Sequence, residues 1–234
     1  RVLFRSLLGL DEASGGYGGT FGDQLALLRE CGRQAVPAPV SHTLLANHLR
    51  SILGQQGLTT PSAVIDGIVL SGSSESVSGE LRDVPWAAML SSVLVQAELE
   101  GAACWIELPV NKSSDHGKNI AGEPTATLSF DSAAPTSVLG SVSEQHLREI
   151  LHRGAAMHSA MMAGALEQAL QIAVGYVLER KQFGQPLAKF QAIQHQLAVM
   201  ATEVAASTRS VDQMQMTEGA PSDLDVAIAK ARVG

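Results

Sequence analysis

Residues 179–200 read ERKQFGQPLAKFQAIQHQLAVM and place a short polar turn between two long alanine-rich runs. Gly184 and Pro186 end the first run, because glycine frees the backbone and proline cannot donate an amide inside a helix. Apolar residues recur at helical spacing on the N-terminal side of the turn. The stretch therefore predicts a hairpin of two long helices.

Three side chains beside this turn have the chemistry of a cofactor clamp. Arg180 carries a permanent charge that can hold a phosphate with two hydrogen bonds. Gln182 adds an amide donor, and Phe183 offers an aromatic face for stacking on a planar ring. A phosphate-bearing cofactor with an aromatic base would use all three. The alternative that these residues leave open is a plain helix-to-helix turn with a solvated arginine.

The first zone outward, residues 1–61, has a helical pattern. Asp23 is the expected N-cap of a helix over residues 24–31, in which apolar side chains share one face. Prolines at 37 and 39 interrupt the pattern, and residues 43–53 predict a second short helix.

The middle zone, residues 62–140, changes character. Residues 64–71, 91–97 and 103–110 are short runs rich in β-branched and other apolar residues, punctuated by Gly, Ser, Pro and Asn. This pattern predicts an antiparallel β-barrel or sandwich.

In the third zone, residues 141–234, helical spacing returns. Ser143 is the expected cap of a continuous helix from about Glu144 to Arg180, roughly 55 Å long. Helices of that length are usually covered within a bundle or an oligomer. The order helix, sheet, helix gives an α+β chain with a β domain between two helical domains.

Composition excludes several classes of function. The formal charge of −7 over 234 residues argues against a nucleic-acid-binding surface. No uninterrupted apolar run approaches the roughly 20 residues of a membrane span, and no signal peptide is expected at the start. Cys31 and Cys104 are isolated, as expected of buried thiols in a reducing cytosol, so we expect a cytoplasmic protein.

A metal site is not expected. His146, His152 and His158 recur every six residues, which turns them about the helix axis at each step. They therefore cannot converge on one metal ion.

The hairpin stretch resembles the signature of the acyl-CoA dehydrogenase family, an Arg-x-x-Phe-Gly turn followed by Phe-Gln. Residues 8–19, 70–97 and 228–231 are similar to other parts of that family. The resemblance implies a fold with an N-terminal helical part, a middle antiparallel β-barrel or sandwich and a C-terminal long-helix bundle. It also implies FAD as cofactor. Its adenine and pyrophosphate end would be contacted, across a subunit interface, by Arg180, Gln182, Phe183, Leu187, Phe190 and Gln191.

Other parts of the family's pattern have no counterpart here. In most members the catalytic glutamate lies beyond the position corresponding to Gly234, together with a glycine-rich loop over the flavin. In a minority it lies on the long helix, about 29 residues before the Phe of the turn, where this chain has Gly154. Glu149 is five residues away on another side of that helix. The Thr-Glu-Pro loop that holds the flavin ring is also missing, and the connection from Leu53 to Val69 is shortened. The catalytic residue thus stays unknown.

The resemblance and these gaps together suggest a subunit of an FAD-dependent acyl-CoA dehydrogenase that completes a partner's flavin site. Such a chain would be the degenerate, base-free member of a heteromeric enzyme, as in members acting on bulky steroid-type acyl-CoA thioesters. Two alternatives stay open. One is a self-sufficient homotetrameric dehydrogenase with further segments, and the other is a flavin-free helical scaffold protein.

The partners implied by the resemblance are a homologous subunit in a homo- or heterotetramer, an acyl-CoA substrate and an electron-transfer flavoprotein as acceptor.

Overall fold

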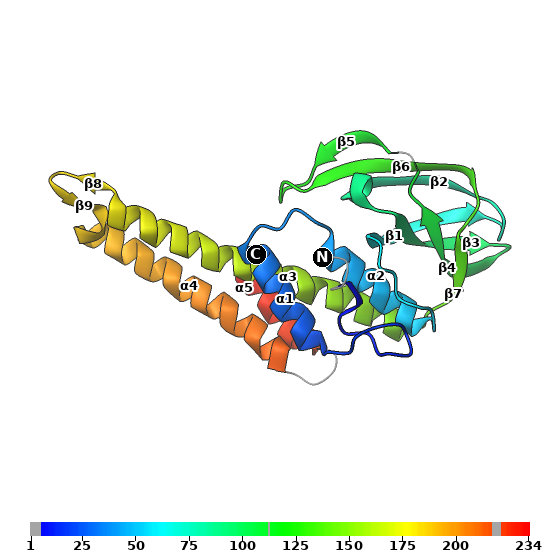
Figure 1. The fold of residues 1–234 in the computed structure, drawn as a ribbon, viewed down its shortest axis with the longest axis horizontal. Coiled ribbons are helices and arrows are strands. Elements are labelled where there is room, and N and C mark those ends of the chain that lie inside the picture. Colours follow the sequence, from blue (N-terminus) through cyan, green and yellow to red (C-terminus); the bar gives the residue numbers. More distant parts are fainter. Residues whose placement is uncertain (1–5, 112, 217–220) are drawn as a thin grey trace. The chain divides into compact units, whose positions relative to one another are not determined.

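The computed structural model describes residues 6–111, 113–216 and 221–234 (Figure 1). Its packing divides the chain into two compact units. The first contains residues 1–19 and 37–151, and the second contains residues 20–36 and 152–234. The division differs from the three zones of the sequence, because the first helix packs with the C-terminal helices rather than with its neighbours in the chain.

The first unit is built on one mixed sheet (Figure 1). In the described residues it has seven strands, in the order β5-β6-β2-β1-β3-β4-β7. These strands are β1 (Ser62–Gly72), β2 (Val77–Pro85), β3 (Ser92–Leu99), β4 (Ala102–Pro109), β5 (Ser114–Lys118), β6 (Pro124–Ala133) and β7 (Ser137–Gly140). The three β-prone runs of the sequence correspond to β1, β3 and β4, so the α+β class is confirmed.

One pairing differs from the expected antiparallel arrangement, because β1 and β3 are parallel. The connection between them contains all of β2 and the 3-10 turn η2 (Ala87–Met89), which is long enough for a crossover. The register of this pair shifts between Ile65 and Val69, where Gly67 has a φ of 76°. The extra residues bend β1 away from its partner.

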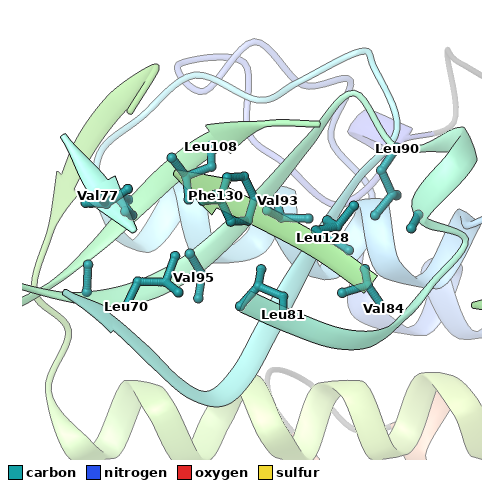
Figure 2. Close-up of a cluster of buried hydrophobic side chains, with 14 of the residues drawn as sticks. Leu70, Val77, Leu81, Val84, Leu90, Val93, Val95, Leu108, Leu128 and Phe130 are labelled. Atoms are coloured by element: carbon teal, nitrogen blue, oxygen red, sulfur yellow. The ribbon is translucent and has the colours of Figure 1, made fainter. Parts of the chain in front are cut away.

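The sheet folds over its main core. β1 and β2 pair only at Ser71–Ser78 and Gly72–Val77, so the strands on either side of this junction diverge. Apolar side chains from both parts point toward one another between them (Figure 2). They include Leu70, Leu81, Val93, Leu108, Leu128 and Phe130, all at most 9% exposed. The cysteines are free thiols, Cys31 buried and Cys104 half-buried beside this core, where burial raises the pKa of Cys104.

The opposite side of β3 and β4 packs on helices. Leu94 and Trp105 contact Ala46 and Leu49 of α2 (Val40–Ile52) and Ile150 of α3 (Glu144–Glu179). α2 begins three residues earlier than the sequence predicts, directly after Pro39. Proline fits just before a first turn, whose amides have no helical partner.

Polar contacts join these helices to each other and to the sheet. A buried ion pair joins Arg50 of α2 to Glu107 of β4 at 2.5 Å. His48 of α2 lies 3.0 Å from Glu149 of α3.

The second unit is a set of helices: α1 (Phe21–Arg33), residues 152–179 of α3, α4 (Gln191–Met216) and α5 (Asp223–Val233). The long helix predicted from Glu144 ends one residue earlier than expected, and Ser143 accepts a hydrogen bond from the His146 amide at its start. The predicted cap of the first helix is wrong. Thr20 is the N-cap, and Asp23 is the third helical residue of a capping box, where its carboxylate accepts from the Thr20 amide.

α1 and α3 approach each other closely at two glycines. A Cβ on Gly32 would overlap the Met161 carbonyl, and one on Gly164 would overlap the Arg29 carbonyl. Because only a hydrogen fits at each position, the two backbones can touch.

Of the described helices, α3 alone is long and apolar enough to cross a membrane. This property rests on length and composition, which bundle helices share. Here the part of α3 in the second unit packs against α1 and carries Glu167, which is paired with Arg29.

Candidate functional site at the hairpin tip

The predicted cofactor residues lie at the end of the hairpin formed by α3 and α4 (Figure 1). Between the helices, β8 (Lys181–Gln182) and β9 (Gln185–Pro186) pair as a short antiparallel ribbon, followed by the 3-10 turn η3 (Leu187–Lys189). The amide of Leu187 donates to the Arg180 carbonyl at 2.9 Å, which closes the ribbon onto the end of α3. The tip is thus an ordered loop of defined hydrogen bonds.

Phe183 and Gly184 form the two-residue turn of this ribbon. Their φ angles are 53° and 83°, the positive pair that a type I′ turn requires. Glycine takes this conformation without strain, whereas for phenylalanine the left-handed region costs about 1–2 kcal/mol. A strained aromatic residue at an exposed turn is a signal of function rather than of stability.

The aromatic side chains of the tip meet in the structure. The rings of Phe183 and Phe190 contact edge to face, with centroids 6.0 Å apart. Phe183 is 90% exposed, while Phe190 and Leu187 are half-buried. The tip therefore presents one fully open aromatic ring supported by a second.

The tip is also locally basic. Arg180, Lys181 and Lys189 stand against the single carboxylate of Glu179, in a chain whose formal charge is −7. Arg180 is exposed, and within the described residues no side chain forms an ion pair or hydrogen bond with its guanidinium. Such a group is free to bind an anion.

The remaining predicted residues lie on either side of these. Gln182 pairs with Gln185 across the ribbon, and Gln191 is the first residue of α4. Both side chains are exposed. The structure thus brings Phe183 and Phe190 into contact, and it places Arg180, Gln182, Leu187 and Gln191 on the same tip without side-chain contacts among them in the described residues.

Sequence reasoning missed an apolar hollow next to the tip. Val177 of α3 and Ala192, Ile193, Gln196, Leu197 and Met200 of α4 line an open space of about 580 Å³. Exposed apolar side chains surround it on the same hairpin, among them Ile172, Tyr176, Leu178 and Val199. The helical spacing of these residues could have identified an apolar face, but not that it lacks a cover. Continuous apolar surface of this kind marks a contact site for another molecule.

The carboxylates of α3 are engaged elsewhere. Glu149 bonds His48, and Glu167 bonds Arg29 and Thr208. Burial would raise the pKa of Glu167, but the hydrogen bonds from Arg29 and Thr208 and the charge of Arg29 outweigh it and lower the pKa below its usual range. Neither carboxylate is available as a free base, and position 154 is glycine.

No group of three or more metal-ligating side chains gathers within the part of the chain that the structure describes. His152 instead lies 2.9 Å from Asp223 of α5.

Comparison with known proteins agrees with this architecture. Residues 145–234 match the model of the acyl-CoA dehydrogenase C-terminal domain. Over 99% of its length the chain is 27% identical to acyl-CoA dehydrogenase FadE34 of Mycobacterium tuberculosis, of which it spans 35%.

Solved structures share the fold. A steroid acyl-CoA dehydrogenase variant, Tcur3481–Tcur3483, superposes with a TM-score of 0.76 at 24% identity, over 98% of this chain and 70% of that one. The ChsE4–ChsE5 complex of M. tuberculosis superposes with a TM-score of 0.75 at 20% identity, over 98% of this chain and 72% of that one. With the Arg-x-x-Phe-Gly turn intact at the end of the hairpin, the chain belongs to the acyl-CoA dehydrogenase family.

Proposed function

We propose that this chain is a subunit of an FAD-dependent acyl-CoA dehydrogenase and that its hairpin tip completes the flavin site of a neighbouring subunit. The observation that carries the proposal is the tip itself: an uncommitted guanidinium at Arg180 beside the open ring of Phe183, both in an ordered turn. The guanidinium suits the pyrophosphate of FAD, and the ring suits its adenine.

The residues present fit one end of FAD. Gln182 and Gln191 add amide donors and acceptors around Arg180, and Leu187 and Phe190 form the floor under Phe183. When bound, FAD supplies the hydride acceptor for the α,β-dehydrogenation of an acyl-CoA thioester. The role of this chain is to hold and orient the cofactor's nucleotide end.

A neighbouring subunit is the proposed source of the catalytic base. Glu149 and Glu167 are held by His48 and Arg29, and Gly154 has no side chain. A carboxylate in a strong hydrogen bond to a cation is a poor proton acceptor. We therefore assign no catalytic residue to this chain.

The partner we propose is a homologous acyl-CoA dehydrogenase subunit in a homo- or heterotetramer. The uncovered apolar face around Ile193 and Leu197 supports a protein contact at the hairpin. The similarity to the steroid enzyme and to the ChsE4–ChsE5 complex supports a heteromeric assembly acting on a bulky steroid-type acyl-CoA. An electron-transfer flavoprotein as acceptor and a cytoplasmic location belong to the same proposal.

The test is co-expression of the chain with the homologous subunit encoded beside it, followed by measurement of bound flavin per complex. Arg180→Ala should lower flavin retention, because the cofactor's phosphates lose their cation. Arg209→Ala, which removes an exposed arginine from α4, is the matched control and should leave flavin content unchanged. Equal flavin in the wild-type and Arg180→Ala complexes would sink the proposed role of the tip.

A second candidate is favoured by coverage, because the chain spans only 35% of its relative FadE34. It would then be part of a longer, self-sufficient homotetrameric dehydrogenase. The intact mass of the natural gene product separates the two: a mass near 24.5 kDa supports the subunit, and a much larger mass supports the longer enzyme. A product with no flavin absorbance, alone or with its partner, would instead indicate a scaffold protein.

A further inference from the structure

A second cavity lies wholly within the first unit, away from the hairpin. It has a volume of about 240 Å³ and is walled by Ala38, Pro39 and Val40 before and at the start of α2, by Pro61 before β1, and by Met89 of η2. No residue of the flavin tip lines it, so an inference about it is independent of the proposed function.

The polar side chains in the deeper wall are committed to the backbone. The Thr43 hydroxyl donates to the Pro39 carbonyl at 2.9 Å and accepts from the Ser62 amide at 3.3 Å. The Ser6 hydroxyl donates to the Leu58 carbonyl at 3.3 Å. Thr59, the other polar residue of the lining, is exposed. The lining contains no charged side chain.

These features decide which ligands the cavity can take. With no charge and its buried hydroxyls already bonded, it offers little to a phosphate or a sugar, whose polar groups would be left unpaired on entry. A hydrocarbon group loses nothing there and leaves water. The volume exceeds the cavity of about 150 Å³ that is known to take benzene.

We propose that this cavity binds a compact hydrocarbon group, a short or branched aliphatic chain or a single alicyclic ring. Met89, 46% exposed, stands among the lining residues. Its unbranched thioether side chain can adjust to groups of different shape. Such a group can come from a free carboxylic acid or from an acyl thioester, since the carboxyl end would remain outside in water.

The experiment measures binding of sodium octanoate, octanoyl-CoA and CoA to the purified chain by calorimetry and by ligand-observed NMR. Two variants fill the cavity from different walls, Ala38→Trp and Met89→Trp. Met216→Ala changes a methionine that is 75% exposed outside the cavity and serves as the matched control. Thermal melting identifies any variant that fails to fold, and either filled variant alone suffices for the test.

We expect octanoate to bind the wild type and Met216→Ala equally, and the filled variants about tenfold more weakly or less, because the buried hydrocarbon contact is lost. Displacement of octanoate by octanoyl-CoA, with none by CoA, assigns the thioester as the source. Octanoate binding without that displacement assigns the free acid. Equal octanoate affinity in the wild type and a folded filled variant, or no binding of either acyl compound, overturns the proposal. Loss of flavin retention in Arg180→Ala does not bear on it.

Discussion

Phe183 and Phe190 contact edge to face across the turn that ends the hairpin, with ring planes at 82°. Phe183 reaches this contact from a left-handed backbone conformation, at a φ of 53°. A ring that is 90% exposed gains little from burial in the chain itself. The cost of its backbone is therefore understandable only if the ring serves another molecule.

Replacing Phe183 by asparagine should separate stability from function. Asparagine tolerates positive φ, so we expect the chain alone to unfold at the same or a slightly higher temperature, a gain of up to about 1 kcal/mol. Flavin retained by the co-expressed complex should fall, because the stacking surface is gone. Thermal melting and flavin absorbance check the two effects. Ile120→Asn, at a fully exposed apolar position in another turn, should change neither flavin content nor assembly, and a Phe183→Asn complex with full flavin would contradict the stacking role.

The close approach of α1 and α3 makes an opposite pair of glycine substitutions informative. Gly164→Ala should destabilise the chain by about 1–3 kcal/mol or more, because the added methyl overlaps the Arg29 carbonyl of a packed helix. Gly175→Ala, eleven residues along the same helix, meets no atom within 4 Å. It should stabilise the chain by up to about 1 kcal/mol through helix propensity.

Urea unfolding of the two variants measures this difference. The packing argument predicts opposite signs. If both variants shifted the midpoint in the same direction by similar amounts, the backbone contact at Gly164 would not be the cause.

Local chemistry made much of this molecule predictable. Gly184 and Pro186 act on the residues beside them, so the turn, the end of the long helix and the placement of Arg180 and Phe183 on one tip follow from neighbouring residues. Ser143 likewise signals the start of α3 through a contact three residues away. The role of these tip residues toward a flavin remains a prediction.

What the sequence did not reveal depends on distant residues. Arg29 reaches Asp212 across 183 positions at 2.8 Å, and no local pattern links the two. The parallel pairing of β1 with β3 depends on which strand edge is open after folding, not on the residues of either strand. The cap at Thr20 was misplaced for a different reason: Thr20 and Asp23 both suit a cap, and their reciprocal bonds decide between them.

Glu167 should make the stability of the chain depend on pH. Its pKa in the folded state lies below the unfolded value of 4.5, so the carboxylate contributes stability at neutral pH. That contribution is lost as the pH falls from about 5 through the folded pKa, where the group takes up a proton. Glu167→Gln should therefore cost about 2 kcal/mol at pH 7 and progressively less toward pH 3.

Thermal melts of the wild type and Glu167→Gln across this pH range check the prediction. Glu98→Gln, an exposed glutamate of β3, is the matched control and should run parallel to the wild type. A gap between wild type and Glu167→Gln that stays constant down to pH 3 would show that shape, not charge, is what the substitution removes.

The buried pair of Arg50 and Glu107 should behave differently from its parts. Both side chains are at most 10% exposed, and the Arg50 Nε also donates to the Gln56 carbonyl at 2.7 Å. Arg50→Met leaves the Glu107 carboxylate buried without its cation, which should cost about 3–5 kcal/mol. Adding Glu107→Leu removes the stranded charge, so the double variant should recover a large part of that loss despite carrying two substitutions. Urea unfolding of the two single variants and the double variant measures the coupling, and Arg82→Met, in an exposed pair with Glu80, should be indistinguishable from the wild type. If the double variant were as unstable as the two single losses added together, the cost would lie in packing rather than in an uncompensated charge.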